Sequence, residues 1–398
     1  MNNYKLEELC EFIRNGASIK QFENAKGYPI TRIETIADSY INLERVGYAD
    51  IIDLSKYEDY LLNIGDILMS HINSEKHLGK TAIFENEDKK LIHGMNLLCI
   101  RPDKKLVSPK YLNYYFKSLA FKKQLPKITK KSVNQASFSV SDLKKLKCKI
   151  HSIESQKKIV KILDKSQELI DKRKKQIEKL DLLVKSKFIE MFGDPFNDEK
   201  GYGIKKLGEV TEVNPKKSEI KELDKDLIVS FVPMDRVSEK GEFAPELSKP
   251  ISEVYNGFTY FKDNDVLFAK ITPCMENGKG AIAINLSNGI GFGSTEFHVL
   301  RPIKDNSNPY WIYHLTTLIE FRRLAERKMT GSAGQKRVPT DFLNNVEVVI
   351  PPIELQNQFA DFAKQVDKLK FELEKSLKEL EDNFNSLMQK AFKGELFN

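Results

Sequence analysis

The sequence repeats itself at an offset of 199 to 201 residues, and this duplication limits the possible folds more than any other feature. The phrase Ile-Glu-x-Gln occurs at 153–156 and again at 353–356. Further short matches keep the same order along both halves: 5–8 with 206–209, 33–36 with 234–237, 64–72 with 263–271, 79–84 with 278–283, 101–102 with 301–302, and 134–135 with 334–335. Self-similarity at one offset is the signature of a repeated structural unit, so the chain is predicted to contain two copies of a unit of roughly 200 residues.

Each copy begins with a segment typical of a mixed α+β globule. Short apolar runs bounded by Gly, Asn and Pro predict strands in both copies. The runs are 61–70, 96–102, 265–271 and 296–302. A Ser-Pro or Asn-Pro dipeptide opens one further segment in each copy, which predicts helices at 108–121 and 308–326. We call the globular parts the first head and the second head, and we expect them to span residues 1–152 and 193–352.

The last quarter of each copy predicts a long helix. Its apolar residues recur at alternating steps of three and four, which is the spacing of a coiled-coil seam. The predicted seam positions are 159, 162, 166, 170, 173, 177, 180, 184, 188 and 191, and then 359, 362, 366, 369, 373, 377, 380, 384, 387 and 391. Ser166 and Arg173 interrupt the first seam. Because one helix cannot bury such a seam alone, we expect the helices at 153–192 and 353–398 to pack as an antiparallel coiled coil with a head at each end. The predicted fold class is α+β with a tandem duplicated unit.

The composition excludes several classes of protein. No run approaches 18 apolar residues, so we expect no transmembrane helix, and the N-terminus lacks the apolar segment of a secretory signal. The four cysteines are scattered without a Cys-x-x-Cys pair, and the six histidines form no metal-ligand pair. These features favour a cytoplasmic protein with reduced thiols and without a metal site.

The positive charge is modest overall but concentrated in one place. The net charge of +7 arises from 64 Lys and Arg against 57 Asp and Glu. Segment 114–132 contains six lysines, interleaved with aromatic and apolar residues, and no acid. It could be the solvated face of a helix or a surface that neutralises phosphates.

The sequence contains no complete catalytic motif. Gly79-Lys80-Thr81 is similar to the end of a phosphate-binding P-loop, but Ser74 stands where that loop needs a glycine. In the second copy Gly280 replaces the threonine. The strings at 142–144 and 214–217 are equally incomplete versions of nuclease and amino-methyltransferase motifs. We therefore expect no cofactor and no catalysis by this chain alone.

Two segments resemble the specificity (S) subunits of type I restriction-modification systems. MFGDPFNDEKGYGIKKLGEV at 191–210 is similar to that family's junction between the central helix and the second recognition domain. KMTGSAGQKRVPTDFLNNVEVVIPPIELQNQF at 328–359 is similar to its domain-to-helix exit. The resemblance covers the whole chain and implies that each head is a target-recognition domain for one half of a bipartite double-stranded DNA site. It further implies that the helices set the spacer between the half-sites and dock two methyltransferase (M) subunits, which restriction (R) subunits join to form an ATP-dependent nuclease.

The segment that leads from each head into its long helix is the candidate DNA-binding site. The second copy reads GSAGQKRVP at 331–339, whereas the first reads KSVNQASFS at 131–139, without the glycines and the Lys-Arg pair. Lys and Arg can bind phosphates or guanine, and Asn and Gln can pair with adenine edges. The candidate DNA-binding residues are Lys127, Thr129, Lys130, Asn134, Gln135, Lys328, Thr330, Ser332, Gln335, Lys336 and Arg337. The alternative for each residue is an ordinary surface turn, and the alternative for the chain is a coiled-coil adaptor that binds protein rather than DNA.

Overall fold

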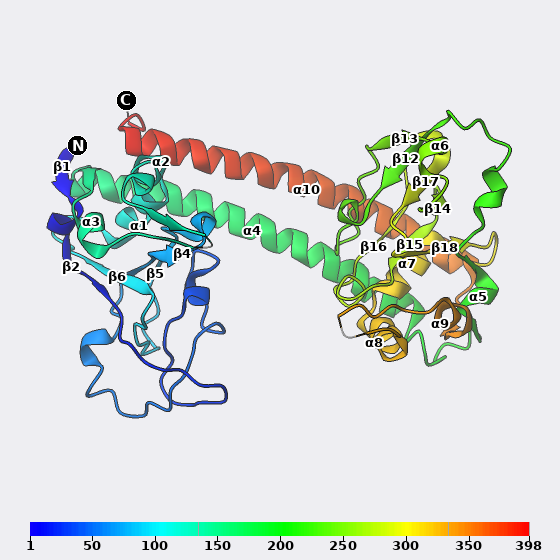
Figure 1. The fold of residues 1–398 in the computed structure, drawn as a ribbon, viewed down its shortest axis with the longest axis horizontal. Coiled ribbons are helices and arrows are strands. Elements are labelled where there is room, and N and C mark those ends of the chain that lie inside the picture. The colour runs from blue at the N-terminus through cyan, green and yellow to red at the C-terminus, as the bar shows by residue number, and fades with distance from the viewer. Residues whose placement is uncertain (134, 333, 398) are drawn as a thin grey trace. The chain divides into compact units, whose positions relative to one another are not determined.

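The computed structural model describes residues 1–133, 135–332 and 334–397, and its helices and strands follow one another in a repeated order (Figure 1). Each head is built on an antiparallel four-stranded sheet, with strand order β2-β6-β3-β5 in the first and β11-β18-β15-β16 in the second. These strands are β2 (Cys10–Asn15), β6 (Leu97–Pro102), β3 (Ile67–Ser70) and β5 (Thr81–Ile83), and β11 (Thr211–Val213), β18 (Phe297–Pro302), β15 (Val266–Ala269) and β16 (Gly280–Ile282). The register also repeats, because Leu68 lies opposite Cys99 and Leu267 opposite Val299. The predicted duplication is therefore confirmed in three dimensions.

One inner strand of each sheet is buried along its whole length. Every residue of β3 and of β15 is buried, as expected for strands that are apolar on both faces. Helix α1 (Pro109–Lys117) packs on the first sheet and α7 (Pro309–Thr317) on the second, each with proline in its first turn. Tyr111 of α1 and Trp311 of α7 lie in the two head cores, where full burial of such a side chain stabilises the fold by about 1.5–3 kcal/mol.

A two-stranded ladder ties the beginning of each copy to its end. Strand β1 (Asn2–Lys5) pairs with β9 (Lys147–Ile150), and β10 (Ile204–Lys206) pairs with β19 (Glu347–Val349). The pairing continues by one bond in each copy, from Leu6 N to Leu146 O and from Leu207 N to Val346 O, both at 2.9 Å. The start of each long helix is thereby fixed beside the point where the chain enters the head.

The heads differ outside the central sheet. The second head has another four-stranded sheet, with strand order β13-β12-β17-β14. These strands are β13 (Ser248–Pro250), β12 (Ile228–Val232), β17 (Ile290–Gly293) and β14 (Thr259–Lys262). The corresponding part of the first head is held by isolated bridges, such as Gly27 with Ile51 and Ile30 with Ile92. The two copies therefore share a common base and differ in the structure built upon it.

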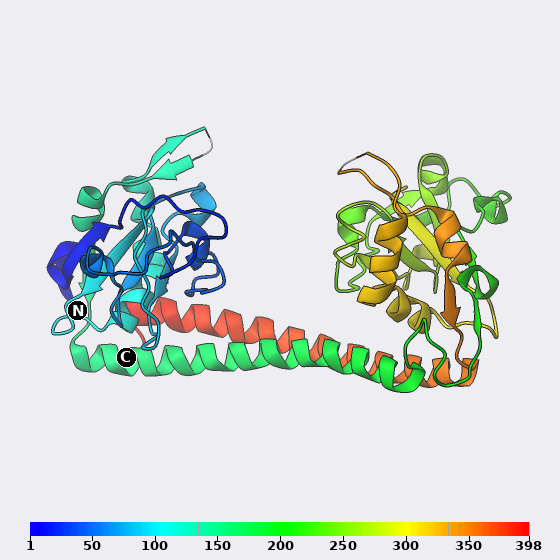
Figure 2. The same ribbon diagram turned by 90° about the horizontal axis from the view of Figure 1, so that it is seen from below.

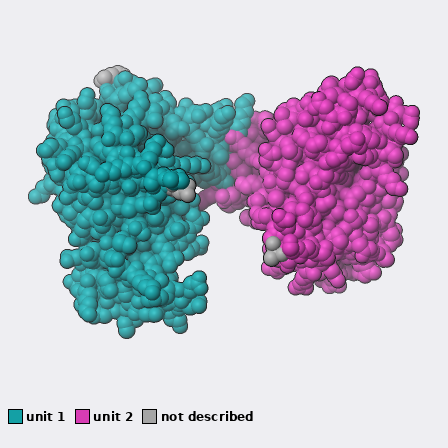
Figure 3. Space-filling view, viewed as in Figure 1, with its two compact units in different colours: residues 1–174, 375–398 teal, residues 175–374 magenta. Residues whose placement is uncertain are grey.

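The chain divides into two compact units, residues 1–174 with 375–398 and residues 175–374 (Figure 3). The division falls inside the two long helices, α4 (Ile153–Phe192) and α10 (Ile353–Lys393). Each unit thus consists of one head and a segment of both long helices, whereas the predicted domain boundaries lie at the helix ends.

In the first unit, the end of α10 completes the core of the first head. Phe392 packs against Tyr111 and Tyr115 of α1, with ring centroids 5.3 and 5.6 Å apart. Lys174 of α4 forms an ion pair with Glu381 of α10, with 2.9 Å between Nζ and Oε1. The two helix segments of this unit lie side by side and run in opposite directions (Figure 2).

In the second unit, the end of α4 plays the same part. Phe188 and Phe192 contact Phe359 of α10 edge to face, with ring centroids 5.3 and 5.4 Å apart. The Nζ of Lys370 lies 2.6 Å from Oδ1 of Asp181. Because Lys370 follows Phe359 whereas Asp181 precedes Phe188, these segments also run in opposite directions.

The buried stripe of the long helices departs from the predicted seam at several positions. Leu163 is fully buried, where Ile162 was predicted, and Leu369 is 50% exposed although it was predicted to be covered. Ile170 and Ile177 are buried as expected. Leu163 belongs to the core of the first head, so its burial is set by the head as well as by the neighbouring helix. The spacing of apolar residues alone carries no information about this second partner.

The repeated Ile-Glu-x-Gln phrase has the same structural role in both copies. Gln156 is fully buried, and its Oε1 accepts a hydrogen bond of 2.8 Å from Ser108 N, directly before α1. Its Nε2 donates to Leu106 O at 3.1 Å and to His151 O at 2.9 Å. Gln356 is also fully buried and makes the same three bonds, with Asn308 N at 2.9 Å, Asn306 O at 3.2 Å and Pro351 O at 2.8 Å. We call each set of three bonds a glutamine clasp, because it fastens the first turn of the long helix to the start of α1 or α7.

Candidate nucleic-acid interface

The candidate segments fold into hairpins at equivalent positions of the two heads. We call residues 130–137 the first exit hairpin and residues 330–337 the second. In the first, β7 (Lys130–Ser132) pairs with β8 (Gln135–Ser137), and in the second, Thr330 and Arg337 exchange hydrogen bonds of 3.0 and 2.8 Å. Each hairpin also pairs with its head, through β4 (Ile72–Asn73) in the first and through Ile271 in the second. The structure therefore brings the two predicted sites to the same place in each copy.

The first exit hairpin presents polar and basic side chains to solvent. It extends from the first unit on the side away from α4 (Figure 2). The exposed candidate residues are Lys127, Lys130 and Gln135. Thr129 is half-buried, and its Oγ1 donates a hydrogen bond of 2.7 Å to Leu125 O, so its hydroxyl proton is already used. Asn134 lies outside the described residues.

The second exit hairpin combines exposed polar residues with one anchored arginine. The exposed candidates are Lys328, Thr330, Ser332, Gln335 and Lys336. Arg337 instead forms a two-point ion pair with Glu296, with Nη2–Oε1 at 2.8 Å and Nε–Oε2 at 2.9 Å. Hydrogen bonds from the guanidinium hold the pKa of Glu296 below its ordinary value. This pair fastens the base of the hairpin to the sheet, so much of the hydrogen-bonding capacity of Arg337 is spent inside the head.

Sequence reasoning missed Val133 in the first exit hairpin. Its side chain is 99% exposed, next to the exposed Ser132 and close to Lys131. Lys131 forms an ion pair of 2.7 Å with Glu75, but both side chains are more than half exposed, so the pair is screened and adds less than about 1 kcal/mol. An apolar group held out in this way can contact sugars or a thymine methyl group. The sequence feature that could have identified Val133 is its position as a single apolar residue between the polar residues Ser132 and Asn134.

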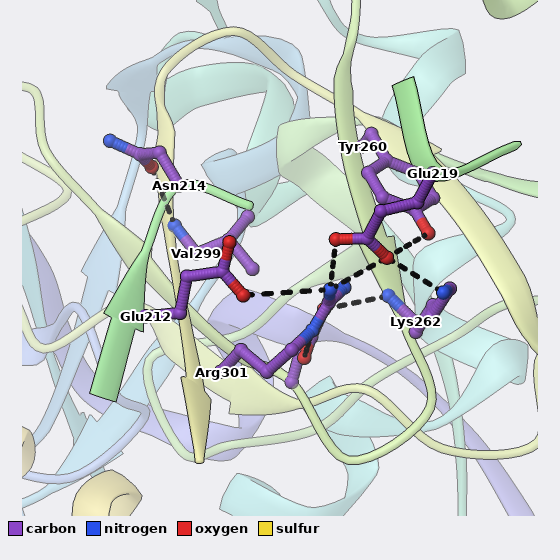
Figure 4. Close-up of polar contacts among 8 residues, drawn as sticks. Glu212, Asn214, Glu219, Tyr260, Lys262, Val299 and Arg301 are labelled. Atoms are coloured by element: carbon purple, nitrogen blue, oxygen red, sulfur yellow. Dashed lines mark hydrogen bonds and ion pairs between the residues drawn. The ribbon is translucent and has the colours of Figure 1, made fainter. Parts of the chain in front are cut away.

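A buried ion pair braces the sheet of each head. Arg101 binds Asp66 through Nε and Nη2 at 2.8 and 2.7 Å, and Arg301 binds Asp265 at 2.8 and 2.8 Å. In the second head the pair extends to Glu219, whose Oε1 lies 2.8 Å from Arg301 Nη1 (Figure 4). Glu219 also accepts hydrogen bonds from Lys262 Nζ at 2.7 Å and from Tyr260 Oη at 3.3 Å. Two-point pairs of this kind fix orientation, so each sheet is a rigid support for its exit hairpin.

The described ranges 1–133, 135–332 and 334–397 contain neither a metal-binding cluster nor a membrane-spanning helix. No group of three or more His, Cys, Asp or Glu side chains there could hold a metal ion. In the same ranges, no helix combines the length and the apolar character needed to cross a bilayer.

Comparison with known families gives one consistent match. The family described as "Type I restriction modification DNA specificity domain" matches residues 1–181 and 199–382, which is once in each copy. The specificity subunit of the type I restriction enzyme MjaX from Methanocaldococcus jannaschii is 31% identical over 387 residues, covering 92% of this chain and 86% of that protein. The EcoAI specificity subunit of Escherichia coli is 40% identical over 165 residues, covering 41% of this chain and 28% of that protein.

Solved structures show the same fold at low sequence identity. A chain from a study of complex assembly and conformational transition of the type I restriction-modification system is similar, with a TM-score of 0.55 at 15% identity. The alignment covers 99% of this chain and 98% of that one. The type I system S subunit from M. genitalium is similar with a TM-score of 0.53 at 13% identity, covering 98% and 96% of the two chains.

Proposed function

The chain belongs to the type I restriction modification DNA specificity family, whose domain matches both of its copies, and we propose that each head reads one half of a bipartite DNA site. Its function is that of a DNA specificity subunit in a type I restriction-modification enzyme. The observation that carries the bipartite reading is the pair of exit hairpins, which stand at equivalent positions on two heads that share a base and differ in the structure built upon it. Two separate readers in one chain suit a target with two half-sites.

We propose a four-part organisation for this task. Residues 1–152 and 193–352 form the recognition domains, and residues 153–192 and 353–398 form an antiparallel coiled coil that sets their spacing. The contacts between the helix segments inside each unit support this arrangement. A continuous helix of 40 residues is about 60 Å long, equal to at most about 18 base pairs of B-DNA.

The exit hairpins and the residues just before them are the proposed DNA contacts. They are Lys127, Thr129, Lys130, Asn134 and Gln135 in the first copy, and Lys328, Thr330, Ser332, Gln335, Lys336 and Arg337 in the second. The exposed lysines are suited to phosphates and the glutamines to base edges. The ion pair of Arg337 with Glu296 holds the second hairpin in place and leaves this arginine fewer hydrogen bonds to offer to DNA than the exposed lysines have.

The proposed partners are double-stranded DNA, two methyltransferase subunits and restriction subunits, with the coiled coil as the docking surface for the methyltransferases. The chain itself is proposed to be non-catalytic and to act in the cytoplasm. The rival function, a coiled-coil adaptor that binds only protein, gives no reason for polar exit hairpins on both heads and is not favoured by the family match.

Sequencing of DNA methylation tests this proposal. The chain is expressed with its methyltransferase partner in a host that lacks both, and the partner alone serves as the control. The expected result is one new motif with two defined halves, an undefined spacer and methylation in both halves. A single uninterrupted motif, or no methylation beyond that of the control, would contradict the proposal.

A further inference from the structure

A basic cavity lies in the first unit beside the first exit hairpin. Its volume is about 420 Å³. Five lysines line it: Lys76, Lys80, Lys117, Lys122 and Lys131. Glu75 is the one acidic residue among its lining residues, and it is paired with Lys131 at 2.7 Å. The cavity therefore carries a large excess of positive charge, which attracts anions.

The lysines are arranged in depth. Lys76, Lys122 and Lys131 are exposed, whereas Lys80 and Lys117 are partly buried. The Nζ of Lys80 donates a hydrogen bond of 2.6 Å to Ala37 O, and the Nζ of Lys117 donates one of 3.3 Å to Ser39 O. An ammonium group has three protons to donate, so neither lysine is saturated by this one bond. Burial and the like charge of Lys122 lower the pKa of Lys117, and the negative charge of a bound anion would offset this lowering.

A buried hydroxyl group lines the same cavity without a partner. Thr81 is 1% exposed, and its Oγ1 makes no hydrogen bond to any described residue. Buried polar groups are almost always paired, so an orphaned one needs an explanation. Thr81, Lys80 and Lys117 line one cavity, and a hydroxyl group together with two unsaturated ammonium groups is a suitable set of donors for an oxyanion.

The second head replaces the decisive groups. Gly280 stands where the first head has Thr81, and Thr317 stands where it has Lys117. Arg322 corresponds to Lys122, but it is 6% exposed and its guanidinium donates a hydrogen bond to Met275 O in the interior. Thr81 and Lys117 are thus specific to the first head, whereas Lys80 recurs in the second head as Lys279, whose Nζ donates a hydrogen bond of 3.2 Å to Met234 O.

We propose that this cavity binds a backbone phosphate of the DNA half-site read by the first head, with Thr81, Lys80 and Lys117 as donors. The inference rests on the proposed function and adds an anchoring site to it. A DNA phosphate is the anion concerned because Thr129 and Lys131, which line the cavity, belong to the candidate DNA-binding segment itself. The first head would thus hold a phosphate of the DNA backbone in a cavity, whereas the second head lacks the equivalent donors Thr81 and Lys117.

Three variants separate this site from general electrostatics. Lys117→Gln removes a donor and its charge from the cavity. Lys123→Gln is the matched control, because Lys123 is exposed in the same segment but does not line the cavity. Thr81→Val removes the orphaned hydroxyl without changing charge or shape, so it should leave the unfolding midpoint unchanged or raise it.

The assay measures binding of the full chain, in complex with its methyltransferase partner, to cognate duplex DNA at several salt concentrations. Lys117→Gln should reduce the slope of log K against log salt by about 0.9, and Lys123→Gln should leave it unchanged. Thr81→Val should weaken binding about tenfold. Duplexes with one neutral methylphosphonate, moved along the first half-site, should reveal one position that weakens binding by the native chain more than binding by Thr81→Val.

Three other outcomes would each refute a different part of the proposal. Native affinity and native salt slope in both cavity variants would refute the proposal and leave the proposed function standing. If inorganic phosphate raised the melting temperature of the native chain but not of Thr81→Val, while DNA binding was equal, the ligand would be a free anion and not the DNA backbone. Failure of the native complex to bind any duplex would instead refute the proposed function.

Discussion

The glutamine clasps predict a large and local loss of stability. Gln356→Met keeps the length of the side chain but removes three hydrogen bonds inside the second unit. It leaves a backbone N–H at Asn308 and two carbonyl groups without partners in a site where Gln356 is 0% exposed. At about 1–3 kcal/mol for each unpaired buried group, with some relaxation, the expected loss is about 3–5 kcal/mol. That is a large part of the 5–15 kcal/mol that typically stabilises a domain.

The single tryptophan reports this loss. Trp311 is the one tryptophan in the sequence, is 1% exposed, and lies in the first turn of α7 beside the clasp. Its fluorescence during urea unfolding therefore follows the second unit. With a denaturant slope of about 2 kcal/mol per molar, the midpoint should fall by roughly 1.5–2.5 M in Gln356→Met.

Gln156→Met is the matched control in the first unit. It breaks the same three bonds far along the chain from the reporter, so the Trp311 transition should stay near its native midpoint. Hydrogen exchange of the amides in α1, residues 109–117, should instead accelerate. Equal midpoint shifts in both variants, or no shift in Gln356→Met, would refute the assignment of the clasps as local fasteners.

Three further expectations follow from other features of the chain. Burial lowers the pKa of His314 to about 4, so as the pH falls this histidine is protonated in the unfolded state before it is protonated in the folded state. The free energy of unfolding should therefore fall by about 2 kcal/mol between pH 7 and pH 5. Urea unfolding read by fluorescence should detect this fall, and His314→Leu should remove the contribution of this residue. Glu296→Gln should release Arg337 from its ion pair, so this variant should bind non-cognate DNA more tightly. The slope of log K against log salt should steepen by about 0.9, and an unchanged slope would mean that Arg337 stays turned inward. Inserting four residues after Lys179 should lengthen the recognised spacer or abolish methylation, and a change in either half-site sequence would contradict the proposed role of α4.

The sequence predicts the duplication and the long helices well because both are repeated signals. The offset of about 200 residues recurs in several separate matches, and each heptad pattern contains ten seam positions. A wrong assignment at one match or one seam position therefore does not change the predicted fold. The predicted seam is wrong where a helix residue also packs against a head, as Leu163 does in the core of the first head.

The details of the interface could not be predicted because they join residues that are distant in sequence. Glu296 and Arg337 are 41 residues apart, and no local pattern connects them. The cavity of the first head gathers Thr81 and Lys117 from a strand and a helix, although the lysine-rich segment itself was evident. The Ile-Glu-x-Gln phrase was visible as a landmark, but the burial of its glutamine against Ser108 and Leu106 depends on the folded head.

The composition of the first unit has a consequence for how the protein is made. Its core includes Phe392 from the last turns of α10, so the first head lacks part of its packing until residue 392 has been synthesised. Residues 175–374 of the second unit are all made earlier than that. At about 5–20 residues per second, the apolar face of α1 waits roughly 15–55 s for its partner. The first unit is therefore completed after the second. A nascent chain that is released before residue 392 leaves Tyr111 and Tyr115 exposed, where they can aggregate or bind chaperones.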